Sequence, residues 1–324
     1  MSTSRRQIIT SGLGLLGTAL LSPRVSIAAP GGDVPKEFKV GFQKGAAILV
    51  LGREQQVIEK RLKPLGVDAV QWVEFQFGPP MLEALGAGAI DIGSVGDTPP
   101  IFAQAAGSPL VYVASTPSAE HAVLVQHDSP IETLAELKGK RVAFGKGSSA
   151  HNLLVAALEK AGLAWSDIIP APLAPADATA AFVKGSVDAW SIWDPYLALA
   201  ELKENARAIV FDKDVHKPNS FYIVGSDFVE KYPAIVARLN AAFAAEGVWA
   251  NSHHEDVAKA QAEATGVDIE AVRRFVDRSI YSVVPLDDDI IKSQQAVADR
   301  FARVGLIPKQ VNVADIVWKW TPST

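Results

Sequence analysis

The stretch of the chain most suggestive of ligand chemistry is FGKGSSAHNLLV, at residues 144–155. Gly145 and Gly147 let the backbone come close to a ligand, and Ser148 and Ser149 offer hydroxyl donors. An apolar helical pattern follows, so these residues are expected at the start of a helix. The first turn of a helix has unpaired N–H groups and carries about half a positive charge. The stretch therefore predicts an anion site.

Neighbouring side chains could strengthen this site, because Asn152 adds an amide and Lys44 and Lys146 add charge. The simpler interpretation is that Ser148 or Ser149 only caps its helix and that Lys146 is solvated. A helix N-terminus favours an anion by about 0.3–2 kcal/mol, whereas a micromolar ligand needs about 8 kcal/mol. Other loops must therefore contribute charge-assisted hydrogen bonds of roughly 1.5–3 kcal/mol each, together with apolar contact.

An internal repeat supplies two such loops. GAIDIGSVGDTP begins at Gly88 and GSVDAWSIWDP begins at Gly185. In both, an aspartate (Asp97 or Asp194) stands where a buried strand gives way to a helix, and a proline follows closely. The match favours a duplicated lobe. We expect the two aspartates to cap helices; alternatively, Asp194 meets a ligand amine or orients Lys44.

Apolar residues stand beside the same loops. Trp193 directly precedes Asp194 and either packs on an alkyl chain or ring in a cleft or belongs to the core. The stretch Ala46–Leu51 follows Lys44 and adds apolar surface near the first loop. The sequence thus offers donors for an anionic head and apolar surface for a tail.

Known catalytic and metal-binding patterns are absent from the sequence. The chain has no cysteine, which removes disulfides, thiolate metal sites and a cysteine nucleophile. It has no Walker A loop and no Gly-x-Ser-x-Gly elbow. His253 and His254 are adjacent rather than spaced to face one metal, and the acidic run 287–289 suits a helix N-terminus. We expect no catalytic residue, no metal and no cofactor.

Composition bounds the class of protein. The 324 residues are 48% hydrophobic and 21% charged, with a formal net charge of −5, and suggest one large domain or two lobes. An acidic protein is a poor match for nucleic acid or an anionic membrane. An anionic ligand must therefore be attracted by a local site.

Elements that would position these loops alternate along the chain, which predicts α/β architecture with parallel sheets covered by helices. Ligands in such sheets bind outside the carboxyl ends of the strands, where helices begin. The expected strands are Phe38–Phe42, Ala69–Phe75, Ile90–Val95, Leu110–Ala114, Ala122–Gln126, Arg141–Phe144, Val187–Ile192, Ile209–Phe211 and Phe221–Gly225. The expected helices include Ser149–Ala161, Pro233–His253, Glu255–Thr265, Asp268–Arg278 and Asp287–Val304.

The N-terminus predicts an export signal over residues 1–28. It contains an Arg5-Arg6 pair, an uncharged stretch Ile8–Leu21 and a small-x-small cleavage pattern at 26–28. The pattern favours the twin-arginine route, with Sec as the alternative. Because a lipid anchor needs a cysteine, we expect a free periplasmic protein. Removing the three arginines of the signal takes the formal charge from −5 to −8.

From about Phe38 to the C-terminus the chain resembles the aliphatic sulfonate-binding proteins of ABC importers. The segments GFQKGAAILVL, GDTPP, KGSSAHN, WDP and NSFYIVG carry the likeness, which extends to taurine- and nitrate-binding relatives. It implies a two-lobed periplasmic-binding-protein fold, each lobe a mostly parallel sheet flanked by helices, with two crossover strands and the ligand in the cleft between lobes. Lobe one would hold residues 38–115 and 226–324, and lobe two residues 117–219.

The resemblance also implies a function. Such a protein captures an alkanesulfonate as a monomer and delivers it to an ABC permease in the inner membrane for sulfur acquisition. Taurine or nitrate binding is an alternative, and so is an enzyme like the thiamine-pyrimidine synthesis proteins, against which export argues. The ligand-binding residues that carry over are Gln43, Lys44, Gly96, Asp97, Thr98, Ser148, Ser149, Asn152, Trp193 and Asp194, with Gly147 beside them.

Overall fold

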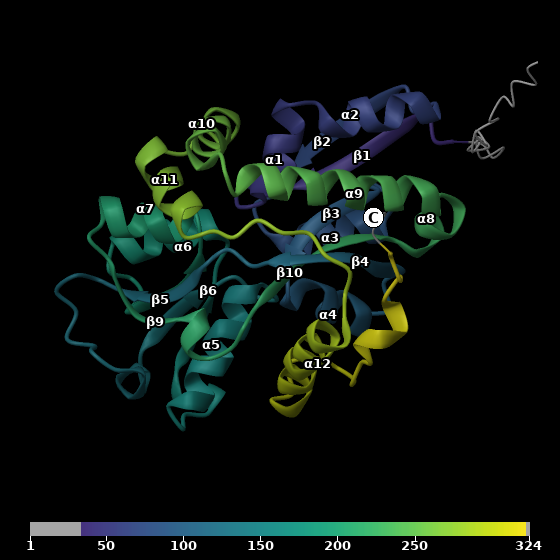
Figure 1. Cartoon of the computed structure of the whole chain (residues 1–324). Helices are drawn as coiled ribbons and strands as arrows, with labels where there is room; N and C mark the ends of the chain where they lie inside the picture. The colour runs from purple at the N-terminus through teal and green to yellow at the C-terminus, as the bar shows by residue number, and fades with distance from the viewer. Residues whose placement is uncertain (1–33, 322–324) are drawn as a thin grey trace, which may run out of the picture. The chain divides into compact units, whose positions relative to one another are not determined.

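The computed structural model describes residues 34–321, so the expected export signal lies outside the described part of the chain. Within that part, strands and helices alternate, and the strands form two five-stranded sheets (Figure 1). The strands are β1 (Glu37–Phe42), β2 (Ala69–Glu74), β3 (Ile92–Gly96), β4 (Leu110–Pro117), β5 (His121–Val125), β6 (Arg141–Phe144), β7 (Ile169–Pro172), β8 (Ala189–Trp193), β9 (Arg207–Phe211) and β10 (Asn219–Gly225). The α-helices are α1 (Ala47–Glu54), α2 (Val57–Leu62), α3 (Gly78–Gly86), α4 (Thr98–Ala105), α5 (Ser149–Lys160), α6 (Pro175–Val183), α7 (Tyr196–Lys203), α8 (Ser226–Lys231), α9 (Pro233–Ala250), α10 (His254–Thr265), α11 (Ile269–Asp277) and α12 (Asp288–Arg303).

The two sheets have the same construction. Their strand orders are β2-β1-β3-β10-β4 and β7-β6-β8-β5-β9. In each sheet the fourth strand, β10 or β5, runs antiparallel to both neighbours, while the other pairings are parallel. The expected α/β class with mostly parallel, helix-flanked sheets is confirmed. The chain enters the second sheet at β5 and returns to the first at β10.

The internal repeat falls at equivalent places, because its halves contain β3 and β8, the third strand of each sheet. Gly88 and Gly185 follow helices α3 and α6 with φ of 70° and 67°, a left-handed conformation that favours glycine. The first aspartates of the two motifs also act alike. Asp91 accepts a hydrogen bond from the backbone N–H of Lys39 at 2.7 Å, and Asp188 accepts one from that of Arg141 at 2.7 Å.

Both faces of the second sheet are buried, as expected of a sheet covered by helices. On β5, Ala122 and Leu124 pack in the cluster that contains Phe182 of α6 and Leu197 of α7. The alternate residues Val123 and Val125 pack with Leu153 and Leu154 of α5. The period of two along the strand thus sends side chains to opposite layers of helices.

The first sheet is covered in the same way. On β10, Tyr222 and Val224 join the cluster beneath α9, while Phe221 and Ile223 join the one that contains Phe301 of α12. The helical C-terminal part therefore completes the layers of the first sheet. Figure 1 shows α9 running across that sheet and α12 beside α4.

One strand differs from expectation, because β7 was not predicted. Its sequence IPAP contains Pro170 and Pro172, which lack the N–H group that a central strand donates. The structure places β7 at the edge of the second sheet, paired only with β6, where proline is tolerated.

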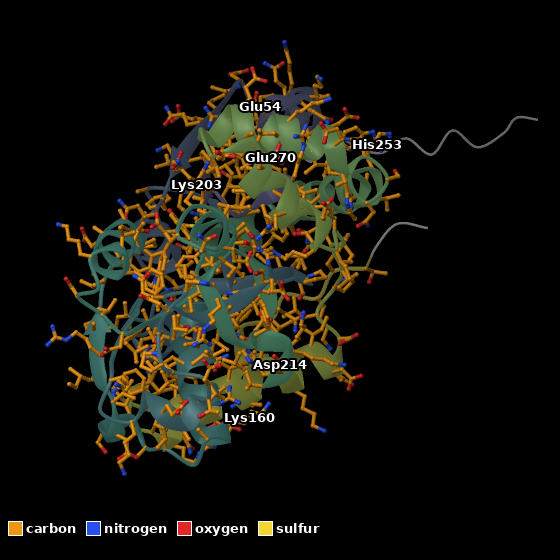
Figure 2. All side chains as sticks on the ribbon, turned by 90° about the vertical axis from the view of Figure 1, so that its left-hand side faces the viewer. Glu54, Lys160, Lys203, Asp214, His253 and Glu270 are labelled. Carbon is orange, nitrogen blue, oxygen red and sulfur yellow. The ribbon has the colours of Figure 1, made fainter. Side chains whose placement is uncertain are left out.

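Charged side chains cover the outside of the molecule. Glu54, Lys160 and Lys203 are exposed and project from the ribbon in Figure 2. Lys160 Nζ donates to the backbone oxygen of Asp214 at 2.8 Å, which ties α5 to the turn after β9. Within residues 34–321, no helix combines the length and apolar character needed to cross a bilayer.

We predict that Phe243→Ala destabilises the protein by about 3–5 kcal/mol, the cost of emptying a large aromatic site in a packed core. Phe243 is fully buried and stacks on Tyr222 with ring centroids 4.7 Å apart. The measurement is urea denaturation followed by circular dichroism. Val248→Ala on the same helix is the matched control, because Val248 is 74% exposed and should tolerate truncation. Equal losses in the two variants would contradict the layered core.

Candidate functional site

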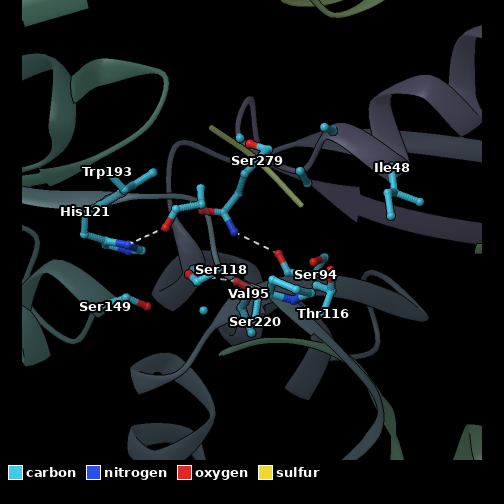
Figure 3. Close-up of a pocket in the computed structure, with 18 of the residues that line it drawn as sticks. Ile48, Ser94, Val95, Thr116, Ser118, His121, Ser149, Trp193, Ser220 and Ser279 are labelled. Carbon is cyan, nitrogen blue, oxygen red and sulfur yellow. Dashed lines mark hydrogen bonds between the residues drawn. The ribbon is translucent and has the colours of Figure 1, made fainter. Parts of the chain in front are cut away.

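A cavity of about 100 Å³ lies where elements of the two sheets meet (Figure 3). This volume is enough for several water molecules or for the head of a small ligand. Its walls come from the starts of four helices, the strand ends that cross between the sheets, and the segment after α11. The lining residues discussed below are Gln43, Ile48, Ser94, Gly96, Thr116, Ser118, His121, Ser148, Ser149, Trp193, Ser220, Ser279 and Tyr281.

Hydroxyl groups dominate the polar lining. Six serines and one threonine contribute: Ser94, Thr116, Ser118, Ser148, Ser149, Ser220 and Ser279. Among the described lining residues there is no lysine, arginine, aspartate or glutamate, and His121 is the one histidine. Hydroxyls can donate to an acceptor without bringing a fixed charge. The chemistry of the lining therefore suits an anion bound mainly by neutral donors.

Helix starts reinforce that preference. Residues 45–48 at the start of α1, Ser148 and Ser149 at the start of α5, Gly78 of α3 and Pro99 of α4 all line the cavity. Each of these helices has eight residues or more, so its first turn presents unpaired N–H groups and a partial positive charge. One helix N-terminus was expected to be too weak to bind an anion alone, and the starts of four helices line this cavity.

The two predicted serines have different roles. Ser148 stands at the N-cap position of α5, but its side chain makes no cap hydrogen bond; its hydroxyl donates to Gly145 O at 2.7 Å. Ser149 lines the cavity, and Figure 3 shows its hydroxyl at the cavity wall. A Cβ built on Gly96 would lie 1.9 Å from Ser149 Oγ. The end of β3 thus approaches α5 closely, and a side chain at Gly96 would require the Ser149 hydroxyl to move.

An apolar surface faces the hydroxyls. Trp193 lines the cavity, is 9% exposed and packs edge-on to Tyr196 at 6.2 Å. From the predicted stretch Ala46–Leu51, residues 46–48 reach the lining, and Figure 3 shows Ile48 on the side of the first sheet. Leu49, Val50 and Leu51 are core residues instead. The apolar part of the cavity is thus smaller than the sequence pattern suggested.

Gln43 and Lys44 diverge although they are neighbours. Gln43 lines the cavity and its amide donates to Ser94 O at 2.8 Å. Lys44 Nζ donates to Thr265 O at 2.6 Å, at the C-terminal end of α10, and the residue is not part of the lining. The lysine charge therefore satisfies a helix C-terminus, where the carbonyl groups are unpaired.

Asp97 is buried behind the cavity and does not cap α4. Its carboxylate accepts hydrogen bonds from Thr98 Oγ1 at 2.8 Å and from Asn152 Nδ2 at 2.7 Å, and His216 Nε2 lies 3.5 Å away. Burial alone would raise the pKa of Asp97, but the hydrogen bonds from His216 and Thr98 outweigh it and hold that pKa below its ordinary value. Asp97 is thus an ionised structural group.

Asn152 links that network to the C-terminal helix, because its Oδ1 accepts from Arg300 Nη1 at 2.7 Å. Gly147, with φ of 73°, packs near Pro79 and Phe102. Thr98, Gly147 and Asn152 thus lie next to the cavity wall without being part of its lining. Their predicted contact with a ligand stays a prediction.

Asp194 is fully buried, and its carboxylate already has partners within the protein. Its carboxylate pairs with Arg278, at 2.8 Å from Nε and 3.0 Å from Nη2, and accepts from the backbone N–H of Ala198 at 3.1 Å. The contact with Ala198 is the expected bond to the first turn of α7. Arg278 also pairs with Glu201 at 3.0 Å. Asp194 neither lines the cavity nor contacts Lys44.

His151 packs within the protein, one turn into α5. Its ring stacks on Phe144 with centroids 4.7 Å apart, and burial lowers the pKa of His151 to about 3. Nδ1 accepts from the backbone N–H of Gly147 at 3.3 Å, which a neutral ring allows. His151 therefore supports the loop before α5 and carries no charge near neutral pH.

Several lining residues were missed by sequence reasoning: Ser94, Thr116, Ser118, His121, Ser220 and Ser279. A usable signal existed, because the lobe bounds that the resemblance implies put the passages between lobes next to residues 115–117 and 219–226, and such passages must border a cleft between the lobes. The segment STPSAEH at residues 115–121 is rich in hydroxyls. No sequence signal brought the segment after α11 to the cavity. Among residues 34–321, no group of three or more acidic or histidine side chains is placed to hold a metal.

We predict that Arg278→Met lowers the free energy of unfolding by about 1.4 kcal/mol at pH 8, because one pH unit above a pKa of about 7 the carboxylate of Asp194 is ionised and the variant leaves it without a partner. Burial raises the pKa of Asp194 to about 7 while the charge of Arg278 opposes that rise. Without the arginine, ionisation of this raised-pKa group costs folding stability, so the deficit should be small near pH 4 and grow as pH rises through 7.

The measurement is thermal unfolding of wild type and variant between pH 4 and pH 8. Arg273→Met is the matched control, because Arg273 forms exposed ion pairs with Glu255 and Glu270 and should change little. A deficit for Arg278→Met that is independent of pH would contradict the assigned role of Asp194.

Comparison with known proteins agrees with this geometry. A family model described as NMT1/THI5 like matches residues 73–250. A protein of Escherichia coli (strain K12) named for aliphatic sulfonates binding is 42% identical over 290 residues, which are 89% of this chain and 90% of that protein.

Solved structures give the same result. The periplasmic aliphatic sulphonate binding protein SsuA from Escherichia coli superposes with a TM-score of 0.80 at 41% identity, covering 90% of this chain and 94% of that one. The alkanesulfonate-binding protein SsuA from Xanthomonas axonopodis pv. citri, bound to MOPS, gives a TM-score of 0.82 at 38% identity, covering 89% and 99%. These relatives are binding proteins by name, which confirms the expectation of a binding protein rather than an enzyme. The chain therefore belongs to the NMT1/THI5-like family and, within it, to the aliphatic sulfonate-binding proteins.

Proposed function

We propose that this protein captures aliphatic sulfonates in the cavity between its two sheets and delivers them to an ABC permease for sulfur acquisition. The observation that carries the proposal is the lining itself: seven Ser and Thr hydroxyls and four helix starts, with no carboxylate among the described lining residues. A sulfonate head has three acceptor oxygens and a permanent negative charge, and such a lining supplies donors in several directions.

The energetic requirement supports this assignment. Micromolar affinity needs about 8 kcal/mol, and hydrogen bonds to a charged group contribute roughly 1.5–3 kcal/mol each. Three or four donors from the lining, with one apolar contact, reach that value. Trp193 and Ile48 provide the apolar contact on opposite sides of the cavity in Figure 3.

Taurine is the second candidate, and the placement of Asp194 disfavours it as the preferred ligand. A taurine ammonium needs a carboxylate partner, but Asp194 already pairs with Arg278 and lies outside the lining. Ethanesulfonate, which has the same length without the amine, should therefore bind at least as well. The smaller, planar nitrate leaves the surface of Trp193 unused.

We further propose that residues 38–115 with 226–324 and residues 117–219 act as two lobes that close on the ligand. The close approach of Gly96 and Ser149 supports closure, because these residues come from helix-strand units of different sheets. The proposal includes a monomer, a periplasmic location and export by the twin-arginine route, with Sec as the alternative. The permease recognises the closed form.

The direct test is a thermal-shift screen of the purified protein against methane-, ethane-, butane- and hexanesulfonate, taurine, nitrate and sulfate. Tris buffer is required, because sulfonate buffers compete for the site under this proposal. A ligand at 100 times its dissociation constant should add about 2.7 kcal/mol of stability. Stabilisation by nitrate or sulfate but by no sulfonate would overturn the proposal.

We predict that affinity rises about three- to fourfold per added carbon over a short series and then levels off, because burying a methylene contributes about 0.8 kcal/mol. Trp193→Ala should flatten this dependence and leave methanesulfonate nearly unaffected. Titration calorimetry measures it. Trp190→Phe is the control, since Trp190 is buried in the core away from the cavity. An unchanged dependence in Trp193→Ala would exclude the tryptophan from the tail pocket.

Gly96→Ala should block closure. The added Cβ would meet Ser149 Oγ at 1.9 Å, and φ of Gly96 is not in the left-handed region, so the backbone itself tolerates alanine. We expect sulfonate affinity to fall at least about tenfold, or about 1.4 kcal/mol, with the melting temperature of the free protein little changed. Gly96→Ala combined with Ser149→Gly should recover part of the loss. Full affinity in the single variant would contradict the closed geometry.

A further inference from the structure

His121 occupies a distinctive position in the cavity. It is the first residue of β5 and lies directly opposite Trp193 on β8 in the antiparallel pairing, with ring centroids 6.3 Å apart. The residue is only 4% exposed and lines the cavity, and Figure 3 shows its ring beside the hydroxyl lining. It is thus placed at the point where the chain has just crossed from the first sheet to the second.

Hydrogen bonds fix which nitrogen carries a proton. His121 Nδ1 lies 2.7 Å from Ala119 O and 3.1 Å from Asp212 Oδ2. Both partners are acceptors when Asp212 is ionised, so Nδ1 must be the N–H donor. The carboxylate is itself held, because Oδ2 accepts from the backbone N–H of His121 at 3.2 Å and Oδ1 from that of Lys213 at 2.7 Å.

The other ring nitrogen, Nε2, is available to a ligand in the cavity. Among residues 34–321, Nε2 of His121 has no hydrogen-bond partner. In a neutral ring with the proton on Nδ1, Nε2 is an acceptor and would face the oxygens of an anion with a lone pair. In the imidazolium it is an N–H donor with a positive charge. Contact between His121 and an anion therefore requires the charged ring.

The surroundings favour that charged ring. Burial alone would lower the pKa of His121, but the hydrogen bond and charge of Asp212 outweigh it, and Asp97 acts in the same direction, so the pKa is raised above its ordinary value. The other charged groups on the adjacent elements are paired with one another. Glu120 accepts from Lys213 at 2.7 Å, Asp194 pairs with Arg278, and His216 lies against Asp97.

We propose that His121 binds the anionic head as an imidazolium through Nε2–H, with Asp212 as its positioning partner, so that ligand affinity is linked to pH. This inference rests on the proposed function, since it assigns the charged contact of the same cavity. The proton belongs to the ring before binding at low pH and is taken up from solvent on binding when the ring starts neutral. The hydroxyls alone bind without proton uptake.

The experiment is titration calorimetry of the full protein with methanesulfonate from about pH 5.5 to 8.5, because methanesulfonate stays ionised over this range. Affinity should be constant while the free His121 ring is protonated and should fall by up to about tenfold per pH unit above the pKa of His121, which Asp212 holds above its ordinary value. At the alkaline end, the heat of binding should depend on the ionisation enthalpy of the buffer, which reports proton uptake. Tris and phosphate give different values without adding a sulfonate.

Variants identify the group responsible. His121→Gln keeps an amide donor near Nε2 and should bind weakly with no pH dependence. Asp212→Asn removes the partner charge and should move the affinity loss to lower pH, which gives a second reading if His121→Gln folds poorly. His216→Gln is the matched control, because His216 is the neighbouring histidine outside the lining, and the pH dependence should survive.

The outcomes separate this inference from the proposed function. Sulfonate binding with the same affinity and no proton uptake at every pH would overturn the role of His121 while leaving the function intact. Loss of the pH dependence in His216→Gln but not in His121→Gln would overturn it too. An absence of sulfonate binding at all pH values would instead overturn the proposed function.

Discussion

The arrangement depends on one electrostatic constraint: two buried carboxylates stand at the strand ends that border a cavity for an anion. Asp97 and Asp194 occupy equivalent places in the repeat, after β3 and β8. Left unpaired, either charge would repel an anion strongly across the low-dielectric interior. Neither carboxylate lines the cavity. Asp97 accepts hydrogen bonds from Thr98 and Asn152, and Asp194 forms an ion pair with Arg278. These partners leave the helix starts free to present N–H groups to the cavity.

The same constraint explains why the lining contains hydroxyls rather than lysine or arginine. A fixed cation in a buried cavity would need a counter-ion whenever the ligand is absent, and burying it unpaired is costly. Hydroxyls carry no such cost and reorient toward whichever acceptor arrives. Lys44, the cation expected beside the cavity, is tied to the C-terminal end of α10 instead.

Sequence patterns predicted the architecture well because the central strands, such as β3, β5 and β8, are buried on both faces and read as short apolar runs between helical periods. Nine of the strands were expected near their observed positions. The exception, β7, combines an edge position with two prolines, and its apolar signal is correspondingly weak. The glycines that begin both halves of the repeat follow α3 and α6 and adopt a left-handed backbone, which gives their presence in both halves a physical reason.

The site was less predictable than the fold. Local motifs pointed to Gln43, Gly96, Ser149 and Trp193, all of which line the cavity. Lys44 was also predicted, but its Nζ donates to Thr265 O and the residue is not part of the lining. A side chain four carbons long reaches many partners, and the sequence does not say which. His121 and Ser279 come from segments that only tertiary packing brings to the cavity. The stretch of chain that crosses between sheets was the one usable clue to the former.

The strand order has a consequence for how the chain acquires its structure. The second sheet is built from one continuous stretch, His121–Phe211, whereas the first needs β10, which follows that entire stretch. Until β10 arrives, β3 lacks one neighbour and β4 lacks its only strand partner in the sheet. In a nascent chain that ends before Asn219, the second sheet can therefore form from local sequence, whereas the first sheet has unpaired strand edges. The first sheet begins to be synthesised before the second but can be completed only after it. A truncation before β10 would therefore leave the first sheet incomplete.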